Sequence, residues 1–152
     1  LSSVVGAMGA GVPMAVAASL RSPGRQVVAF LGDGGALMTG NEIATAMQYG
    51  GTPIIIISDN KRYGTIGMHH EVRYPNRPYE AAVKLTNPDF AAWARVFGAE
   101  GITINSEAEV EAGIVPARSA ADAGVGRARE ATLRDPPPPA WTHGRSADYN
   151  AA

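Results

Sequence analysis

Short apolar runs that end in polar or glycine-rich turns predict three buried strands in the first two thirds of the chain. Residues 26–31 read Gln-Val-Val-Ala-Phe-Leu and are followed by Gly32-Asp33-Gly34-Gly35. The second run, residues 54–57, contains four isoleucines in a row and ends at Asp59-Asn60, which we interpret as a turn. Continuous β-branched runs are typical of strands that are buried on both faces. A third, shorter run covers residues 101–104.

Capping residues and helical spacing predict helices between these strands. Thr39-Gly40-Asn41-Glu42 matches a capping box and opens an apolar pattern that stops at Gly50. Asn87-Pro88-Asp89 predicts an N-cap with Pro at the first helical position, and the helix continues to Phe97. Ser106-Glu107-Ala108-Glu109 is a further capping box. Strands that alternate with helices predict an α/β fold, with a parallel sheet flanked by helices.

The end of the chain has a different composition. Residues 117–152 contain few large apolar side chains, and Pro136 to Pro139 are incompatible with a helix or a central strand. We therefore expect one domain over residues 1–116 and a Pro/Ala/Arg-rich tail over 117–152, disordered or non-native in sequence and without a strand. Because the chain begins at Leu1 and its first methionine is Met8, we expect the domain to be a fragment of a longer chain.

Composition and charge narrow the classes of partner. Thirteen basic and fourteen acidic side chains give a formal charge of -1, which argues against binding to nucleic acid or to an anionic membrane. The absence of cysteine excludes disulfides and thiolate metal sites, and it fits a reducing, cytoplasmic location. The weakly polar stretch over residues 4–20 is interrupted by glycines and Pro13, so we expect neither a membrane-spanning helix nor a signal peptide.

The turn after the first predicted strand combines glycines with one carboxylate. Gly32, Gly34 and Gly35 allow the backbone to approach a ligand closely, and N–H groups in such a turn can hold a diphosphate. Asp33 would repel that diphosphate unless a divalent cation, such as Mg²⁺, lay between them. Asn60 supplies a neutral oxygen at the end of the next strand, 27 residues later. Ligands of parallel sheets bind at this edge.

Other interpretations of these residues are weaker. Residues 35–40 have the spacing of a P-loop, but Asn41 and Glu42 stand where Lys and Ser or Thr are required. No G-x-G-x-x-G fingerprint occurs in the required context. His69-His70-Glu71 lacks the helical spacing of zinc ligands. Taken alone, Asp33 and Asn60 would be turn residues, and only their pairing favours a cation site.

These residues carry a resemblance to a known family. Gly32-Asp33-Gly34 followed by Asn60 resembles the thiamine-diphosphate-binding motif. Residues 6–13, Gly-Ala-Met-Gly-Ala-Gly-Val-Pro, resemble the segment that precedes this motif in acetolactate synthase-like and 2-oxo-acid decarboxylase enzymes. The resemblance covers about residues 4–114. It implies the thiamine-diphosphate-binding fold, as the C-terminal domain of a larger enzyme.

The resemblance implies a role for individual residues. Mg²⁺ would be held by the side-chain oxygens of Asp33 and Asn60 and by the backbone carbonyl of Arg62, whose guanidinium would not be a ligand. Met8 matches the apolar residue that keeps the cofactor bent. The implied cofactor-binding residues are Met8, Gly32, Gly34, Gly35, Asn60, Tyr63 and Gly64. The implied substrate pocket contains Thr65, Ile66 and His69.

The resemblance also implies an activity and its partners. The full-length enzyme would form or cleave C–C bonds of 2-oxo acids, with a 2-oxo acid or acyl-CoA decarboxylase as the alternative. The family's activating Glu belongs to the pyrimidine-binding domain of a neighbouring subunit, in a homodimer or homotetramer, so this chain alone should be inactive. In biosynthetic acetolactate synthases a Trp occupies the position of His69, which leaves the substrate open. A non-catalytic fragment or pseudoenzyme is the alternative of another class.

Overall fold

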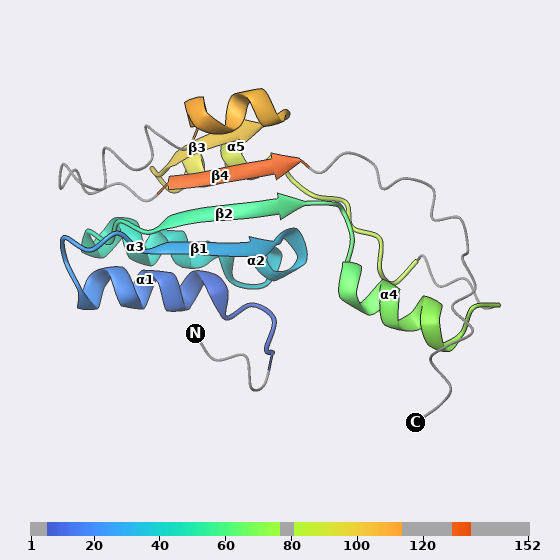
Figure 1. Cartoon of the computed structure of the whole chain (residues 1–152). Coiled ribbons are helices and arrows are strands. Elements are labelled where there is room, and N and C mark those ends of the chain that lie inside the picture. The colour runs from blue at the N-terminus through green and yellow to red at the C-terminus, as the bar shows by residue number, and fades with distance from the viewer. Residues whose placement is uncertain (1–5, 77–80, 114–128, 135–152) are drawn as a thin grey trace.

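The computed structural model describes residues 6–76, 81–113 and 129–134, and in these ranges the protein is an α/β domain (Figure 1). Its sheet has four strands in the order β1-β2-β4-β3, and all neighbours are parallel. The strands are β1 (Val28–Gly32), β2 (Ile54–Asp59), β3 (Glu100–Ile104) and β4 (Arg129–Arg134). The predicted fold class, a parallel sheet flanked by helices, is therefore confirmed.

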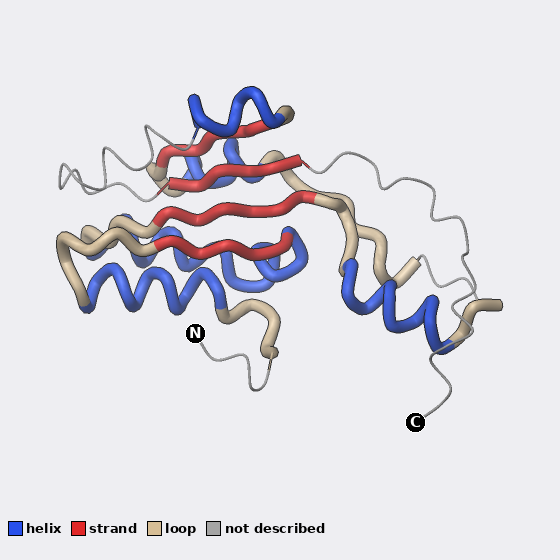
Figure 2. Tube along the Cα trace, viewed as in Figure 1, coloured by secondary structure: helices blue, strands red, loops and turns tan. Residues whose placement is uncertain are grey.

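Helices lie between β1 and β2 and between β2 and β3, as Figure 2 shows. The α-helices are α1 (Gly11–Arg21), α2 (Asp33–Thr39), α3 (Ile43–Tyr49), α4 (Gly64–Arg73) and α5 (Phe90–Val96). Short 3-10 helices are η1 (Gly40–Glu42) and η2 (Glu107–Glu109). The apolar pattern did not predict α1, because glycines and Pro13 interrupt it. Pro13 lies in the first turn of α1, where a helix tolerates proline since the missing N–H would have no partner there.

The hydrophobic core lies between one face of the sheet and the helices α1, α2, α3 and α5. Ile55 and Ile57 of β2 are buried at its centre, as expected for this run of isoleucines. The other buried members are Val12, Val16, Ala36, Ile43, Ala46, Phe90, Ala94 and Ala99. The opposite face of β1 is uncovered within the described ranges, since Phe30 is 70% exposed. Packing against the helices therefore buries one face of the sheet, while part of the other face, at β1, stays exposed.

Both predicted capping boxes are wrong. The Thr39 hydroxyl makes no capping bond and instead donates to the carbonyl of Gly9, while the Glu42 carboxylate accepts from Thr45. Ser106 likewise forms no side-chain cap. Local spacing suggested the boxes, but a tertiary contact to the N-terminal loop competes for the Thr39 hydroxyl.

The start of α5 also differs from the prediction. Asp89, and not Asn87, is the N-cap of α5, and its carboxylate accepts a hydrogen bond of 2.9 Å from the backbone nitrogen of Ala92. The helix itself and its stripe of apolar residues are confirmed over Phe90–Val96. Because Asp89 caps the helix, the side chain of Asn87 is available for another contact.

The prediction that the tail contains no strand is wrong at β4. Residues Arg129–Arg134 form a central strand that pairs with β2 on one side and with β3 on the other. The sequence Arg-Glu-Ala-Thr-Leu-Arg lacks the apolar pattern of a buried strand, so periodicity could not find it. Backbone pairing on both sides stabilises the strand instead. Residues 117–128 and 135–152, the rest of the predicted tail, lie outside the described residues.

Candidate functional site

Polar side chains meet at the carboxyl ends of β1 and β2. The parallel register places Gly32 of β1 opposite Ser58 of β2, so the residues that follow them share one edge of the sheet. Asp33, the first residue of α2, is 1% exposed, and Asp59, the last residue of β2, is 7% exposed. The interpretation of Asp59 as a turn residue is wrong, because Asp59 belongs to the strand and is buried. Two buried carboxylates therefore lie at this edge.

A third side chain joins the two carboxylates. The Nδ2 of Asn87 donates to Oδ2 of Asp33 at 2.6 Å and to Oδ1 of Asp59 at 2.6 Å. The remaining polar atom of Asn87, Oδ1, is buried and has no hydrogen-bond partner. Sequence reasoning missed both Asp59 and Asn87, because nothing local links the end of β2 to the loop before α5.

The two carboxylates have no basic partner within the described residues. The guanidinium of Arg62, in the loop after β2, pairs with the carboxylate of Glu71 in α4 instead. Hydrogen bonds from Asn87 and Gly34 offset only part of the cost of burying two like charges this close together, and a bound cation would offset the rest. Hard cations such as Mg²⁺ prefer carboxylate and amide oxygens, which is what this edge offers. The residues present therefore fit a divalent cation.

The glycine turn beside Asp33 is closely packed. A Cβ on Gly34 would lie 2.5 Å from Cδ1 of the Tyr63 ring, so Tyr63 covers this glycine and brings the β2 loop against the β1 turn. The backbone nitrogen of Gly34 donates to Oδ1 of Asp33 at 2.8 Å. Two predicted cofactor-binding residues, Gly34 and Tyr63, are thus in contact with each other.

The loop after β2 carries the other predicted metal ligands. Asn60 is exposed, and its Oδ1 accepts a hydrogen bond of 3.1 Å from the backbone nitrogen of Arg62. Lys61 has a positive φ of 57°, which turns the chain out of the strand. An isolated antiparallel bridge between Arg62 and Lys84 then holds the loop. This bridge belongs to the segment that leads to Asn87, so the Asn60 loop and the Asn87 loop are tied together.

The N-terminal loop reaches the same edge. A Cβ on Gly35 would lie 3.9 Å from the backbone nitrogen of Gly9, and the Thr39 hydroxyl donates to the carbonyl of Gly9. Met8, which precedes Gly9, is exposed, as is Met38 at the end of α2. The structure therefore places the loop of Met8 next to Gly35.

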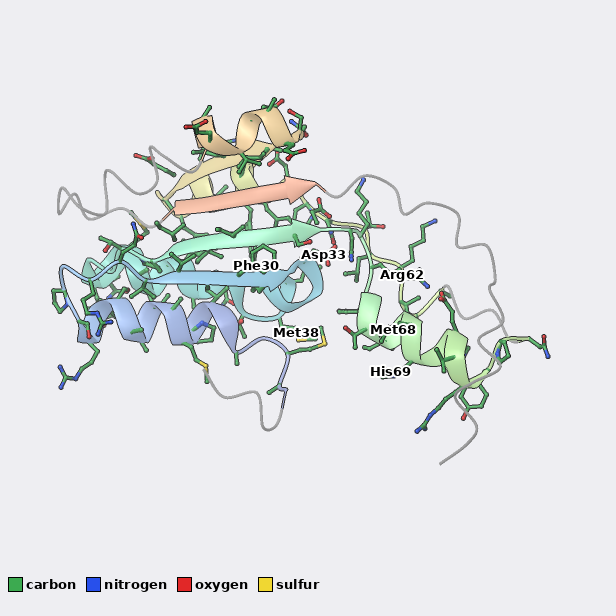
Figure 3. The ribbon with its side chains drawn as sticks, viewed as in Figure 1. Phe30, Asp33, Met38, Arg62, Met68 and His69 are labelled. Carbon is green, nitrogen blue, oxygen red and sulfur yellow. The ribbon has the colours of Figure 1, made fainter. Side chains whose placement is uncertain are left out.

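Helix α4 carries the residues of the predicted substrate pocket. Thr65, Ile66 and His69 are all exposed on this helix. In Figure 3, α4 stands beyond the end of β2, with Met38 and Met68 on either side of the space between α2 and α4. Sequence reasoning did not predict this helix, which contains Gly64 and Gly67. In the part of the chain that the structure describes, no group of three or more His, Cys, Asp or Glu could hold a metal.

The described helices include none that is long and apolar enough to cross a membrane.

The polar edge of the sheet, at the carboxyl ends of β1 and β2, indicates a class of protein. Parallel strands whose carboxyl ends carry oxygen ligands beside a glycine turn are typical of α/β domains that bind a phosphorylated ligand.

Comparison with known families identifies the domain. The family model described as "Thiamine pyrophosphate enzyme, C-terminal TPP binding domain" matches residues 1–125. The chain belongs to this family of thiamine pyrophosphate, or thiamine diphosphate, enzymes. The resemblance to acetolactate synthase-like proteins is thereby confirmed.

Individual relatives cover most of this chain. It is 38% identical to the Bacillus subtilis protein YdaP over 110 residues, which is 72% of this chain and 19% of that protein. It is 38% identical over 104 residues to the acetolactate synthase large subunit of Parasynechococcus marenigrum, covering 68% of this chain and 17% of the relative. The acetolactate synthase isozyme 2 large subunit of Escherichia coli is 34% identical over 113 residues, covering 74% and 20%. The chain thus spans about a fifth of the length of these relatives.

A solved structure supports the fold. The thiamine diphosphate-dependent 4-hydroxybenzoylformate decarboxylase of Rhodococcus jostii matches with a TM-score of 0.73 over 86% of this chain and 23% of that one. At 24% sequence identity, this likeness concerns the fold alone.

Proposed function

We propose that this chain binds thiamine diphosphate through Mg²⁺ at the carboxyl ends of β1 and β2, as part of an acetolactate synthase-like enzyme that acts on 2-oxo acids. The observation that carries the proposal is the pair of buried carboxylates, Asp33 and Asp59, which no basic side chain neutralises within the described residues. A cation that also binds a diphosphate would neutralise them.

Each residue of the motif has a role in this proposal. Asp33 and Asn60 would hold Mg²⁺ by their side-chain oxygens, and Arg62 by its backbone carbonyl. The guanidinium of Arg62 is not needed there, because it pairs with Glu71. Gly32 leaves room for the diphosphate, the turn through Gly34 and Gly35 would line it, and Tyr63, packed against Gly34, completes the wall of the site with Gly64. Gly64 lies against Asn60, since a Cβ there would be 3.4 Å from its Nδ2.

The bound cofactor would supply the carbanion chemistry, and this chain would supply orientation and a dry environment. Met8, in the loop that lies against Gly35, would keep the cofactor in its bent conformation. Thr65, Ile66 and His69 would contact the substrate from α4. The relatives named acetolactate synthase support C–C bond formation on a 2-oxo acid, that is, a transferase or lyase.

The proposed site is completed by a second domain. The pyrimidine-binding domain of a neighbouring subunit would cover the cofactor's other end and would bring the activating Glu. Exposed apolar side chains at the site support such a cover, namely Met8, Met38, Ile66 and Met68. The full-length protein would then be a homodimer or homotetramer, and this chain alone would be inactive.

Calorimetry tests the proposal. Thiamine diphosphate should bind the chain in MgCl2 and not in EDTA. Asp33→Asn should weaken binding by more than about tenfold, because it removes the charged ligand of the cation. Glu111→Gln, which removes one negative charge from an exposed site, is the matched control and should bind like the wild type.

Equal affinity with and without Mg²⁺, or wild-type affinity in Asp33→Asn, would contradict the proposal. Turnover assays of the full-length protein with pyruvate and other 2-oxo acids would then separate synthase from decarboxylase activity.

A further inference from the structure

Asn87 reaches the strand ends from a distant part of the chain. It lies in the loop before α5, 54 residues after Asp33 and 28 residues after Asp59. Asp89 caps α5, so the helix does not require the side chain of Asn87. An isolated bridge between Arg62 and Lys84, together with a 2.8 Å bond from the backbone nitrogen of Leu85 to the carbonyl of Lys61, fixes the loop. The bonded segment before Asn87 and helix α5 after it therefore both fix the position of Asn87.

The contacts of Asn87 use only its donor group. The amide nitrogen carries two N–H groups, and it contacts one oxygen of Asp33 and one oxygen of Asp59. The two carboxylates repel each other, and an N–H donor between them offsets that repulsion through two charge-assisted hydrogen bonds. Oδ1 of Asn87, by contrast, is buried without a partner. The geometry thus depends on donation by Asn87 and not on its shape alone.

We propose that Asn87 is a positioning residue that holds the carboxylates of Asp33 and Asp59 side by side, so that the site is formed before a cation arrives. The inference rests on the proposed function, because the cation it serves is the proposed Mg²⁺. Groups that orient metal ligands by hydrogen bonds raise metal affinity, and their loss typically weakens binding by about 10–100-fold. Asn87 would act in this way through Asp33.

The first experiment is made without metal. The stability of the chain in EDTA is measured by urea unfolding for Asn87→Ala and for Asn87→Asp. Both should be less stable than the wild type, and Asn87→Asp more strongly so, because it places a third carboxylate against the other two. The double variant Asp59→Asn/Asn87→Asp exchanges the amide and the carboxylate. It should be more stable than Asn87→Asp, because the amide at position 59 can then donate to the carboxylate at position 87, although that carboxylate still faces Asp33. Asn76→Ala, at an exposed asparagine, is the control.

Asn and Asp are nearly equal in size. If the side chain at position 87 only filled space, the double variant would therefore be no more stable than Asn87→Asp. Failure of the exchange to recover stability would therefore contradict the pairing of Asn87 with Asp59. If Asn87→Ala does not fold, the exchanged variant still carries the test.

The second experiment measures cation binding. Mg²⁺ is titrated by calorimetry into each variant in the presence of a fixed excess of thiamine diphosphate, with a titration into thiamine diphosphate alone as the blank. Asn87→Ala should bind Mg²⁺ about tenfold or more weakly than the wild type and Asn76→Ala. Unchanged affinity in Asn87→Ala, with Mg²⁺ bound by the wild type, would overturn this inference and leave the proposed function intact. Absence of Mg²⁺ binding in the wild type would overturn both.

Discussion

At the scale of single residues, Asp33 is held at both of its carboxylate oxygens. Oδ1 accepts from the backbone nitrogen of Gly34, and Oδ2 accepts from Asn87. A side chain fixed in this way loses little freedom when it binds a ligand, which favours affinity. The glycine next to it must remain a glycine for another reason, because the Tyr63 ring fills the space that a Cβ would occupy.

Gly34→Ala should destabilise the chain by about 1–3 kcal/mol, because the new methyl group would overlap the Tyr63 ring and force it to move. Gly32→Ala is the matched control. A Cβ at Gly32 would meet nothing within 4 Å, and its φ of -79° suits alanine, so the change should stay within about 1 kcal/mol. Urea unfolding of both variants is the measurement. Equal stabilities would contradict the packing described here.

Part of the site could be predicted from residues alone. Asp33, in the glycine turn, and Asn60 are separated by the length of a helix and a return strand. This spacing predicts that both lie at one edge of the sheet. Asn87 could not be found in this way, because Asn87-Pro88-Asp89 contains two residues that can cap a helix. Only the folded chain decides that Asp89 caps α5 and that Asn87 turns toward the carboxylates.

At the scale of elements, Arg62 connects α4 to the loop after β2. The guanidinium of Arg62 covers Gly67, where a Cβ would lie 2.8 Å from Nη2, and it pairs with Glu71 one turn later. Gly67 is the buried residue of α4. The helix that carries Thr65, Ile66 and His69 is thus fixed to the loop that carries Asn60.

Glu71→Gln should loosen α4 with little effect on global stability. The Arg62 and Glu71 side chains are 35% and 60% exposed, and surface pairs contribute less than about 1 kcal/mol. Hydrogen exchange should therefore become faster at the amides of Gly64–Arg73 while unfolding by urea is almost unchanged. High salt should have the same effect on the wild type. Glu111→Gln is the control, and wild-type protection of α4 in Glu71→Gln would disprove the attachment.

The sequence predicted the elements that have a strong apolar pattern. The two strands β1 and β2 and the helix α5 follow from buried runs and stripes, with shifts of a few residues at their ends. α4 was missed because it exposes most of its side chains and contains two glycines. β4 was not predicted, because backbone pairing with two neighbouring strands stabilises it, and such pairing leaves no pattern in the local sequence.

At the scale of the whole molecule, apolar side chains remain exposed at the proposed site. Met38 lies at the end of α2 and Met68 on α4, on either side of the space between these helices (Figure 3). Exposed apolar patches of several hundred Å² usually mark a missing partner. The chain alone should therefore self-associate at this surface.

Met38→Ser combined with Met68→Ser should weaken that self-association by about tenfold or more, because it removes apolar area from the contact. Sedimentation velocity over a range of concentrations is the measurement. Val96→Ser is the control, since Val96 is 80% exposed on α5 and lies outside the proposed site. A larger effect of Val96→Ser than of the methionine pair would place the contact elsewhere.

The central position of β4 has a consequence for the chain as it is synthesised. β1, β2 and β3 leave the ribosome before β4, yet β2 and β3 each pair with β4 and not with each other. Until residue 134 has emerged, β2 exposes one unpaired edge next to its four isoleucines. Such edges pair readily with other chains, and long-range pairing of this kind forms slowly. β4 therefore determines how long this edge of the nascent chain is vulnerable to aggregation, and the yield of folded protein should depend strongly on substitutions in β4.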